Sequence, residues 1–432
     1  MEPIYHFVGI KGSGMSALAS IIHDMGGVVQ GSDTTNYLFT QKGLNERRIK
    51  LYPFNEATLT PQHTVIIGNA FKEHEEVLKA RQKGITCIPY HTFLGDFLTN
   101  FTSIAVSGTH GKTTTTGLLS TVLKEKEKTA YLIGDGTGVG SPESEYFVFE
   151  ACEYQRHFLS YRPSYTIITN IEHDHPDYFK DIEDVLDAFQ TFANQTKEYV
   201  IACGDDLNVK KLTNLTHLMT YGIQPSNDVF ATNIEKSENG TSFDVIIKNK
   251  FFHRFHTPFF GEHMILNALA TITIGYLEWM TPESIEKGLQ SFKGVQRRFS
   301  ETHHHDQIMI DDYAHHPTEI KATLQAVQQK YPTKPLVAIF QPHTFTRTKA
   351  FSKEFIEALE LADEVYLTDI FGSAREQVET FDLQTLIGQS HKIKYLSFES
   401  LETLKQHRNS VLVFMGAGDI QKYQEAYQQL SC

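Results

Sequence analysis

A glycine-rich segment with a lysine and two threonines has the residue types of a phosphate-binding loop. Its residues are Ser107, Gly108, Thr109, His110, Gly111, Lys112, Thr113 and Thr114. The segment follows an apolar run at 101–106 and opens a helical pattern. Glycines let successive backbone N–H groups turn toward phosphate oxygens, and a helix N-terminus adds its positive end. We therefore expect Lys112 to neutralise phosphate charge and the Thr113 hydroxyl to bind Mg²⁺.

This segment departs from the common G-x-x-x-x-G-K-[ST] pattern, because Val106 stands where the leading glycine would be. A glycine-rich turn with a neighbouring lysine is the structural alternative. The strand before the segment, the helix after it and the paired threonines favour phosphate binding instead.

A second glycine-rich loop lies at 9–14, before a helical pattern from Met15 to Met25. Its glycine spacing is the reverse of the dinucleotide fingerprint, yet a glycine loop at a helix N-terminus still favours a diphosphate. Asp33 ends the next predicted strand, about twenty residues on, where a carboxylate meets a ribose or sugar hydroxyl. A purely structural turn remains the alternative. The candidate binding residues here are Gly12, Ser13, Gly14, Met15, Ser32 and Asp33.

Acidic and histidine residues follow two further apolar runs. Glu150 ends the run 146–149, and Glu172, His173 and His175 follow the run 165–169. Charged residues at the ends of apolar strands beside a phosphate loop are placed to hold Mg²⁺. For His173 and His175, a solvent-facing turn is the alternative.

Length and composition narrow the class of protein. The chain has 432 residues, which suits two or three domains, and a net charge of −13, which argues against binding nucleic acid through a basic face. No stretch approaches the ~18 apolar residues of a membrane helix, and the N-terminus does not resemble a signal peptide. Four cysteines without C-x-x-C spacing predict a reducing, cytoplasmic location.

Repeated strand–loop–helix units predict an α/β fold with parallel sheets. Such units begin near residues 4, 101 and 336, and later strands are expected at 365–370 and 411–415. The alternating pattern within 228–258 instead predicts antiparallel strands. We place the domain boundaries near residues 98 and 296.

With these motifs assembled, the sequence resembles the Mur ligase family over essentially its whole length. The matching segments are 108–114, 169–175, Gly261-x-His263-x-x-x-Asn267-Ala268 and 311–319. Three further segments are similar to the branch of the family that adds L-alanine. They are 9–16, 341–348 and 415–419.

The resemblance implies three domains and one reaction. The domains are a Rossmann-like UDP-sugar-binding domain (1–97), a central P-loop-type ATP-binding domain (98–295) with a parallel sheet and a small antiparallel sheet, and a Rossmann-like amino-acid-binding domain (296–432). The implied reaction joins L-alanine to the lactyl carboxylate of UDP-N-acetylmuramate through an acyl phosphate, for peptidoglycan synthesis. It consumes ATP with Mg²⁺, or Mn²⁺ in its place, and we expect a monomer or a weak homodimer.

The resemblance also assigns roles to individual residues. The implied ATP-binding residues are Gly108, Thr109, Gly111, Lys112, Thr113, Thr114, Asn267 and Asp312, with Asn267 at the adenine and Asp312 at the ribose. The implied metal ligands are Thr113, Glu150 and His175. The implied amino-acid pocket contains Tyr313, His315, His343 and Arg347, with Arg347 on the alanine carboxylate. The expected catalytic residues are Lys112, His110, His315 and Arg347.

Two departures and several alternatives remain. Many relatives carry arginine at the position of Thr344, and Cys152 replaces the aspartate of the usual E-A-D-E motif. The nearest alternative is a recycling ligase that adds the L-Ala-D-Glu-diaminopimelate peptide to the same UDP-sugar. A folate polyglutamylating enzyme, a nicotinamide-dependent dehydrogenase and a non-catalytic UDP-sugar-binding protein fit the motifs less well.

Overall fold

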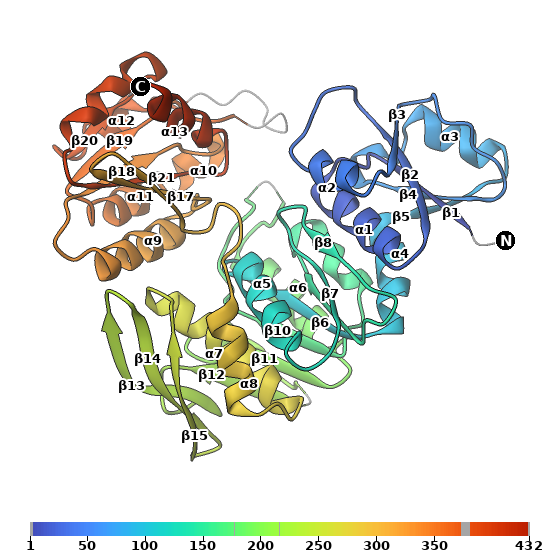
Figure 1. Ribbon diagram of the computed structural model, residues 1–432, viewed down its shortest axis with the longest axis horizontal. Coiled ribbons are helices and arrows are strands. Elements are labelled where there is room, and N and C mark those ends of the chain that lie inside the picture. The colour runs from blue at the N-terminus through green and yellow to red at the C-terminus, as the bar shows by residue number, and fades with distance from the viewer. Residues whose placement is uncertain (1–2, 177, 216, 373–380, 431–432) are drawn as a thin grey trace. The chain divides into compact units, whose positions relative to one another are not determined.

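The computed structural model describes residues 3–176, 178–215, 217–372 and 381–430 (Figure 1). The strands form three sheets, and helices connect strands within each sheet. This arrangement confirms the predicted three-domain α/β fold. By internal contacts the chain forms two compact units. The first contains 1–232, 245–253 and 266–292, and the second contains 233–244, 254–265 and 293–432.

The first sheet is fully parallel, with the strand order β3-β2-β1-β4-β5. Its strands are β1 (Ile4–Val8), β2 (Val28–Asp33), β3 (Lys50–Pro53), β4 (His63–Ile67) and β5 (Thr86–Pro89). The helices of this part are α1 (Ser13–Asp24), α2 (Gln41–Glu46), η1 (Asn69–Phe71), α3 (Glu75–Gln82), α4 (Tyr90–Phe97) and η2 (Leu98–Asn100). The strand order reverses beside β1, and such a switch point is where open α/β sheets bind ligands.

The second sheet has ten strands in the order β15-β14-β13-β12-β11-β10-β6-β9-β7-β8. They are β6 (Thr102–Ser107), β7 (Thr129–Leu132), β8 (Gly138–Val139), β9 (Tyr146–Glu150), β10 (Tyr165–Ile168), β11 (Tyr199–Cys203), β12 (Leu218–Gly222), β13 (Val229–Ser237), β14 (Gly240–Ile247) and β15 (Lys250–Thr257). Its helices are α5 (Lys112–Leu123), η3 (Tyr154–Ser160), α6 (Ile182–Ala193), η4 (Val209–Lys211), α7 (Glu262–Leu277) and α8 (Pro282–Ser291). Both neighbours of β6, namely β10 and β9, run parallel to it, so the carboxyl ends of all three strands meet at one edge.

The strands β13, β14 and β15 form consecutive hairpins at the end of this sheet. Two-residue connections join them, which is the geometry of antiparallel neighbours. In the second connection, Lys248 and Asn249 have φ values of 47° and 62°. A two-residue hairpin turn of type I′ needs positive φ values at both positions. The alternating pattern at 228–258 therefore correctly predicted this segment.

The third sheet has the order β16-β17-β21-β18-β19-β20, and among these described strands β16 alone runs antiparallel to its neighbour. Its strands are β16 (Ser300–His304), β17 (Gln307–Asp312), β18 (Leu336–Phe340), β19 (Glu364–Leu367), β20 (Ile393–Tyr395) and β21 (Val411–Met415). Its helices are α9 (Pro317–Lys330), α10 (Phe345–Ala350), α11 (Ser352–Leu359), α12 (Gln384–Ile387), η5 (Phe398–Gln406) and α13 (Ile420–Gln429).

The apolar runs of the third sheet are buried on both faces. In β17, Ile308 and Ile310 belong to one core cluster with Leu324 of α9, whereas Met309 belongs to another with Tyr427 of α13. Successive side chains of a strand point to opposite faces, so helices must cover both sides of such a sheet. This burial keeps the strand ends, and the side chains that follow them, in fixed positions.

No helix of the described residues is long and apolar enough to cross a membrane. The predicted domain limits near residues 98 and 296 stay predictions.

Two stacked histidines join α4 to η3 within the first unit. The rings of His91 and His157 lie 4.0 Å apart with an interplanar angle of 14°. The His91 Nε2 atom lies 2.8 Å from the amide nitrogen of Asn69, and Nδ1 lies 2.5 Å from the Tyr161 hydroxyl. An amide nitrogen only donates, so Nε2 must accept, which requires a neutral ring. Burial, together with the charges of His157 and Lys72, lowers the pKa of His91 to about 3.

This stack predicts a pH dependence of stability. The unfolded chain binds a proton at a histidine near pH 6.5, but folded His91 does so only near pH 3, so stability is lost as the pH falls between these values. The variant His91→Phe keeps a ring and has no such proton. We compare the free energy of unfolding of the natural chain with that of His91→Phe. As the pH falls through this window, the difference should change in favour of His91→Phe by up to ~1.4 kcal/mol per pH unit.

Thermal unfolding between about pH 8 and pH 4 measures this difference. The control is His303→Phe, since the His303 side chain is 71% exposed. A gap between the natural chain and His91→Phe that stays constant with pH would contradict the prediction.

Candidate active site

The predicted phosphate loop connects β6 to α5, and two of its glycines are required by the geometry. Gly108 and Gly111 have φ values of 130° and 83°, in the region that favours glycine. A Cβ atom on Gly108 would lie 2.0 Å from the Thr169 hydroxyl oxygen. A Cβ atom on Gly111 would lie 3.1 Å from the amide oxygen of Asn267, so α7 approaches the loop closely here.

The Lys112 side chain folds back over this loop. Its ammonium donates to the carbonyl oxygens of Gly108 and Thr109, at 2.5 and 2.9 Å, and lies 3.1 Å from the Glu153 carboxylate. Burial alone would lower the pKa of Lys112, but the facing Glu153 carboxylate, with Glu150 nearby, raises it above the ordinary value. Lys112 is therefore a fixed positive charge at the start of α5.

Oxygen donors gather at the first turn of α5. The Thr113 hydroxyl donates to the Glu150 carboxylate at 3.0 Å, and the Gly134 backbone N–H donates to the same oxygen at 2.9 Å. A Cβ atom on Gly134 would meet that carboxylate, so a larger residue there would displace the Glu150 side chain. Hydroxyl and carboxylate oxygens are the ligands that Mg²⁺ prefers. The predicted pair Thr113 and Glu150 therefore fits a magnesium ion, and Thr114 follows on the same turn.

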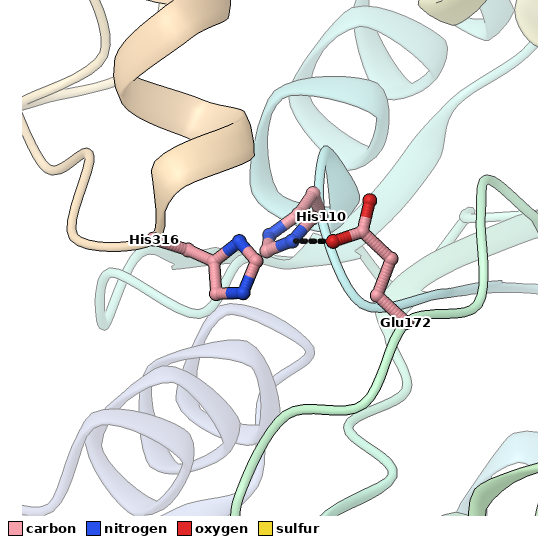
Figure 2. Close-up of side chains that lie close together, drawn as sticks. All are labelled: His110, Glu172 and His316. Atoms are coloured by element: carbon pink, nitrogen blue, oxygen red, sulfur yellow. Dashed lines mark ion pairs between the residues drawn. The ribbon is translucent and has the colours of Figure 1, made fainter. Parts of the chain in front are cut away.

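The loop is also tied to the segment that follows β10. The His110 backbone N–H donates to the Asn170 side chain at 2.9 Å, and the Thr169 hydroxyl donates to the His110 carbonyl at 2.5 Å. Figure 2 shows the His110 ring facing the Glu172 carboxylate, and their nearest atoms, Nε2 and Oε2, lie 3.4 Å apart. These contacts fix the direction in which the His110 ring points.

His175 lies beside the carboxylate that pairs with Lys112. Its Nε2 atom is 3.8 Å from Glu153 Oε1 and 3.8 Å from Asp174 Oδ2, and its ring lies 4.8 Å from that of Tyr154. His175 has a φ of 55°, which is uncommon for a residue other than glycine and is typical of constrained functional segments. The structure thus brings His175 close to the partner of Lys112, and its role as a metal ligand stays a prediction.

The second glycine loop opens α1, with Gly12 at the N-cap position and Ser13, Gly14 and Met15 in the first turn. A Cβ atom on Gly14 would lie 2.7 Å from the Tyr90 hydroxyl oxygen, so a larger residue there would displace the buried Tyr90 ring. Asp33 accepts hydrogen bonds from the backbone N–H groups of Lys11 and Thr34, both at 2.7 Å.

Ser32 belongs to the same group. It is fully buried, and its carbonyl accepts the backbone N–H groups of Gly9 and Ile10. The predicted UDP-sugar residues therefore lie together at the carboxyl ends of β1 and β2.

In the second unit, Asp312 ends β17 and is buried. Its two carboxylate oxygens accept the backbone N–H groups of Phe299 and Ala314, at 2.9 and 2.8 Å. Burial raises the pKa of Asp312 to about 6, although Arg298 and the two hydrogen bonds oppose the rise. The structure shows Asp312 ordering its own loop, and its ribose contact stays a prediction.

The aromatic ring of Tyr313 lies close to two cations. The guanidinium carbons of Arg297 and Arg298 are 5.0 and 5.1 Å from the ring centroid. Arg297 also donates to the Gly416 carbonyl at 2.7 Å, which ties Tyr313 to the loop after β21.

Three predicted residues of the amino-acid pocket lie together near the ends of β17 and β18. The rings of His315 and His343 are 6.2 Å apart, and the Arg347 guanidinium lies 3.4 Å from His343 Nδ1. Arg347 is only 6% exposed. Thr344, at the position where relatives often carry arginine, has a φ of 67° and caps α10 by accepting the Arg347 backbone N–H. This threonine therefore positions the helical turn that carries Arg347.

Sequence reasoning missed Glu153 as a functional residue, although it lies in a quoted motif. The doubt raised at Cys152 is unaffected, and the next residue, Glu153, is the buried partner of Lys112. Lys11 was also missed, although it lies inside the first glycine loop. The signal for both was a charged residue inside a motif whose other residues had been assigned roles.

Three sequence models of one family match the chain. They are the Mur ligase family catalytic domain at 4–102, the Mur ligase middle domain at 106–275, and the Mur ligase glutamate ligase domain at 297–421. Together these matches cover almost the whole chain.

Solved structures agree with these matches. The chain is 26% identical to UDP-N-acetylmuramate-alanine ligase from Thermotoga maritima, with a TM-score of 0.81 over 99% of both chains. It is also 26% identical to UDP-N-acetylmuramate:L-alanyl-gamma-D-glutamyl-meso-diaminopimelate ligase from Neisseria meningitides, with a TM-score of 0.60 over 69% of this chain and 100% of that one. A murein peptide ligase from Psychrobacter arcticus, 22% identical with a TM-score of 0.69 over 99% of both chains, shares the fold. The chain belongs to the Mur ligase family and is an ATP-dependent ligase that forms amide bonds.

Proposed function

We propose that this ligase joins L-alanine to the lactyl carboxylate of UDP-N-acetylmuramate, giving ADP and phosphate. The observation that carries the proposal is the grouping of Lys112, Thr113 and Glu150 at one end of the phosphate loop. The likeness to the T. maritima alanine ligase supports the choice of substrates. The domain limits near residues 98 and 296, the monomeric or weakly dimeric state and the cytoplasmic location belong to the same proposal.

In the first step, a lactyl carboxylate oxygen attacks the γ-phosphorus of ATP, and ADP leaves. A carboxylate does not condense with an amine at neutral pH, so this step creates a better leaving group. The Lys112 ammonium and the loop N–H groups stabilise the charge of the transferring phosphoryl group. His110, oriented by the loop and by Glu172, lies on the same segment and is placed to add a further donor.

Mg²⁺ would be held by Thr113 and Glu150, with His175 as a further ligand, and Mn²⁺ would fit the same donors. When bound, the ion neutralises charge on the phosphate oxygens. ATP would lie along the loop toward Asn267, whose side chain lies close to Gly111 of the loop.

In the second step, the alanine nitrogen attacks the acyl carbon, the carbon–oxygen bond to phosphate breaks, and phosphate leaves. The His315 Nδ1 atom lies 3.0 Å from the Tyr313 carbonyl and 3.1 Å from Glu319 Oε2, so Nδ1 carries the hydrogen. The Nε2 atom is then the basic nitrogen that takes a proton from the attacking amine.

Arg347 would bind the carboxylate of the incoming amino acid. Arginine pairs with carboxylates in a bidentate manner, and this interaction is stronger away from water. The burial of Arg347 beside His343 suits a small amino acid better than the more distant carboxylates of a peptide. The alternative, a recycling ligase for the L-Ala-D-Glu-diaminopimelate peptide, has support from the N. meningitides structure.

Phosphate release from ATP with UDP-N-acetylmuramate tests the choice of substrate. We expect turnover with L-alanine and at least ~100-fold lower kcat/KM with the L-Ala-D-Glu-diaminopimelate tripeptide, because a misplaced carboxylate loses the Arg347 contact. Turnover with the tripeptide alone would move the chain to the recycling branch.

A Lys112 series separates catalysis from folding. Lys112→Met removes one partner of a buried ion pair and should cost about 3 kcal/mol of stability. The double variant Lys112→Met/Glu153→Gln also removes the unpaired charge of Glu153 and should recover most of the stability. Its activity should stay at least ~100-fold below the natural level. Thermal unfolding and phosphate release measure the two effects, with the exposed Lys180→Met as control.

Recovery of activity in the double variant would show that Lys112 acts on the fold alone.

Arg347→Met should raise the KM for L-alanine by about 10- to 100-fold, which corresponds to the loss of a charged hydrogen bond. The KM for ATP should change by less than about twofold, because ATP binds elsewhere. Steady-state kinetics measures both values. Lys349→Met, on the same helix and with the same change of charge, is the matched control. Equal effects of the two variants would refute the assignment.

A further inference from the structure

Lys11 lies inside the first glycine loop, between β1 and α1, but its side chain does not extend toward water. A lysine in a glycine-rich phosphate loop normally serves as a point charge for phosphate. Lys11 is instead 5% exposed and turned toward the chain that follows β2. The Lys112 ammonium also contacts carbonyl oxygens, but these belong to its own loop, and it faces the Glu153 carboxylate as well. The carbonyl partners of the Lys11 ammonium lie instead in the segment after β2.

Every polar group of Lys11 contacts the segment 33–40. Its backbone N–H donates to Asp33 Oδ2 at 2.7 Å, and its ammonium donates to the carbonyls of Thr34 and Asn36, both at 2.7 Å. Its own carbonyl accepts the Thr40 hydroxyl at 2.5 Å. One residue thus holds both ends and the first half of this segment.

The segment between Asp33 and Gln41 contains neither helix nor strand and presents three consecutive apolar residues. The exposed fractions of Tyr37, Leu38 and Phe39 are 66%, 43% and 65%. A contiguous exposed apolar group on a loop marks an interaction site more often than single exposed residues do. The carbonyls of Leu38 and Phe39 accept backbone N–H groups from the start of α2. The Lys11 ammonium holds the part of the segment that precedes Tyr37.

The position of the segment indicates which part of a ligand it meets. In doubly wound sheets, the diphosphate lies at the first glycine loop and the ribose meets the carboxylate that ends β2. Residues directly after Asp33 then lie on the ribose and base side of a nucleotide. Aromatic rings stack on bases and contribute binding energy there.

On the basis of the proposed function, we propose that Lys11 is a positioning residue for the UDP-sugar. It holds the segment 34–40 beside the glycine loop, so that Tyr37, Leu38 and Phe39 form an apolar surface for the uridine end of the substrate. A lysine is required because a flexible stem must reach two carbonyl oxygens more than twenty residues away in sequence.

Hydrogen exchange of the full-length protein without ligand tests the first half of this role. In Lys11→Met, which keeps the stem and loses the donors, the amides of 34–40 should exchange at least ~10-fold faster, while those of β6 and α5 stay unchanged. Lys11→Arg, which keeps donors, should exchange more slowly than Lys11→Met. Lys42→Met, an exposed lysine in α2, is the matched control.

Calorimetric binding of UDP-N-acetylmuramate tests the second half. Affinity should fall at least ~10-fold in Lys11→Met and also in Tyr37→Ser/Phe39→Ser, while the KM for ATP changes less than about twofold. The double serine variant alters exposed side chains only, so its melting temperature should stay at the natural value.

Three outcomes would contradict the role that we propose for Lys11. Faster exchange with unchanged affinity would show that the segment does not serve the UDP-sugar. Lower affinity with unchanged exchange would show that Lys11 contacts the substrate directly. If both exchange and affinity stay unchanged, Lys11 neither holds the segment nor supports binding of the UDP-sugar. If the natural chain itself fails to bind the UDP-sugar, the proposed function fails, and this result is distinct from the other three.

Discussion

The ion pair between Lys112 and Glu153 is the constraint on which the site depends. The two side chains are 11% and 3% exposed, so both charges have been taken largely out of water. Removing either partner would leave a buried charge, and a buried ion pair is by itself weak evidence for stability. Its value here is positional: Glu153, on the segment after β9, holds the ammonium over the loop between β6 and α5. The ion pair thereby joins the segment after β9 to the phosphate loop and to the first turn of α5.

The three sheets place their functional residues by the same physical rule. Parallel strands end at a common edge, so the loops after neighbouring strands bring side chains that are distant in sequence together. In the first sheet these loops follow β1 and β2, and in the second they follow β6, β9 and β10. In the third they follow β17, β18 and β21. Cores buried on both faces of the sheets keep these edges rigid, and the chemistry is carried by loops.

Much of this arrangement could be predicted because its signals are local. The glycines of the phosphate loop, the strand before it and the carboxylate of Glu150 all lie within short motifs, and the antiparallel hairpins follow an alternating pattern. The partners of Lys112 and Lys11 could not be predicted, because each contact depends on how distant segments approach one another. Glu153 lies 41 residues from Lys112, and the Asn36 carbonyl lies 25 residues from Lys11. A backbone carbonyl also leaves no trace in residue type.

The central claim is that the chain activates a carboxylate by phosphorylation before the amine attacks. The most direct measurement supplies UDP-N-acetylmuramate with ¹⁸O at both oxygens of its lactyl carboxylate, together with ATP and L-alanine, and analyses the released phosphate by mass spectrometry. Because the attacking carboxylate oxygen leaves with phosphate in the second step, we predict that each phosphate carries a single ¹⁸O atom. Phosphate without ¹⁸O, despite formation of the amide, would contradict an acyl phosphate and the roles given to the residues around the phosphate loop.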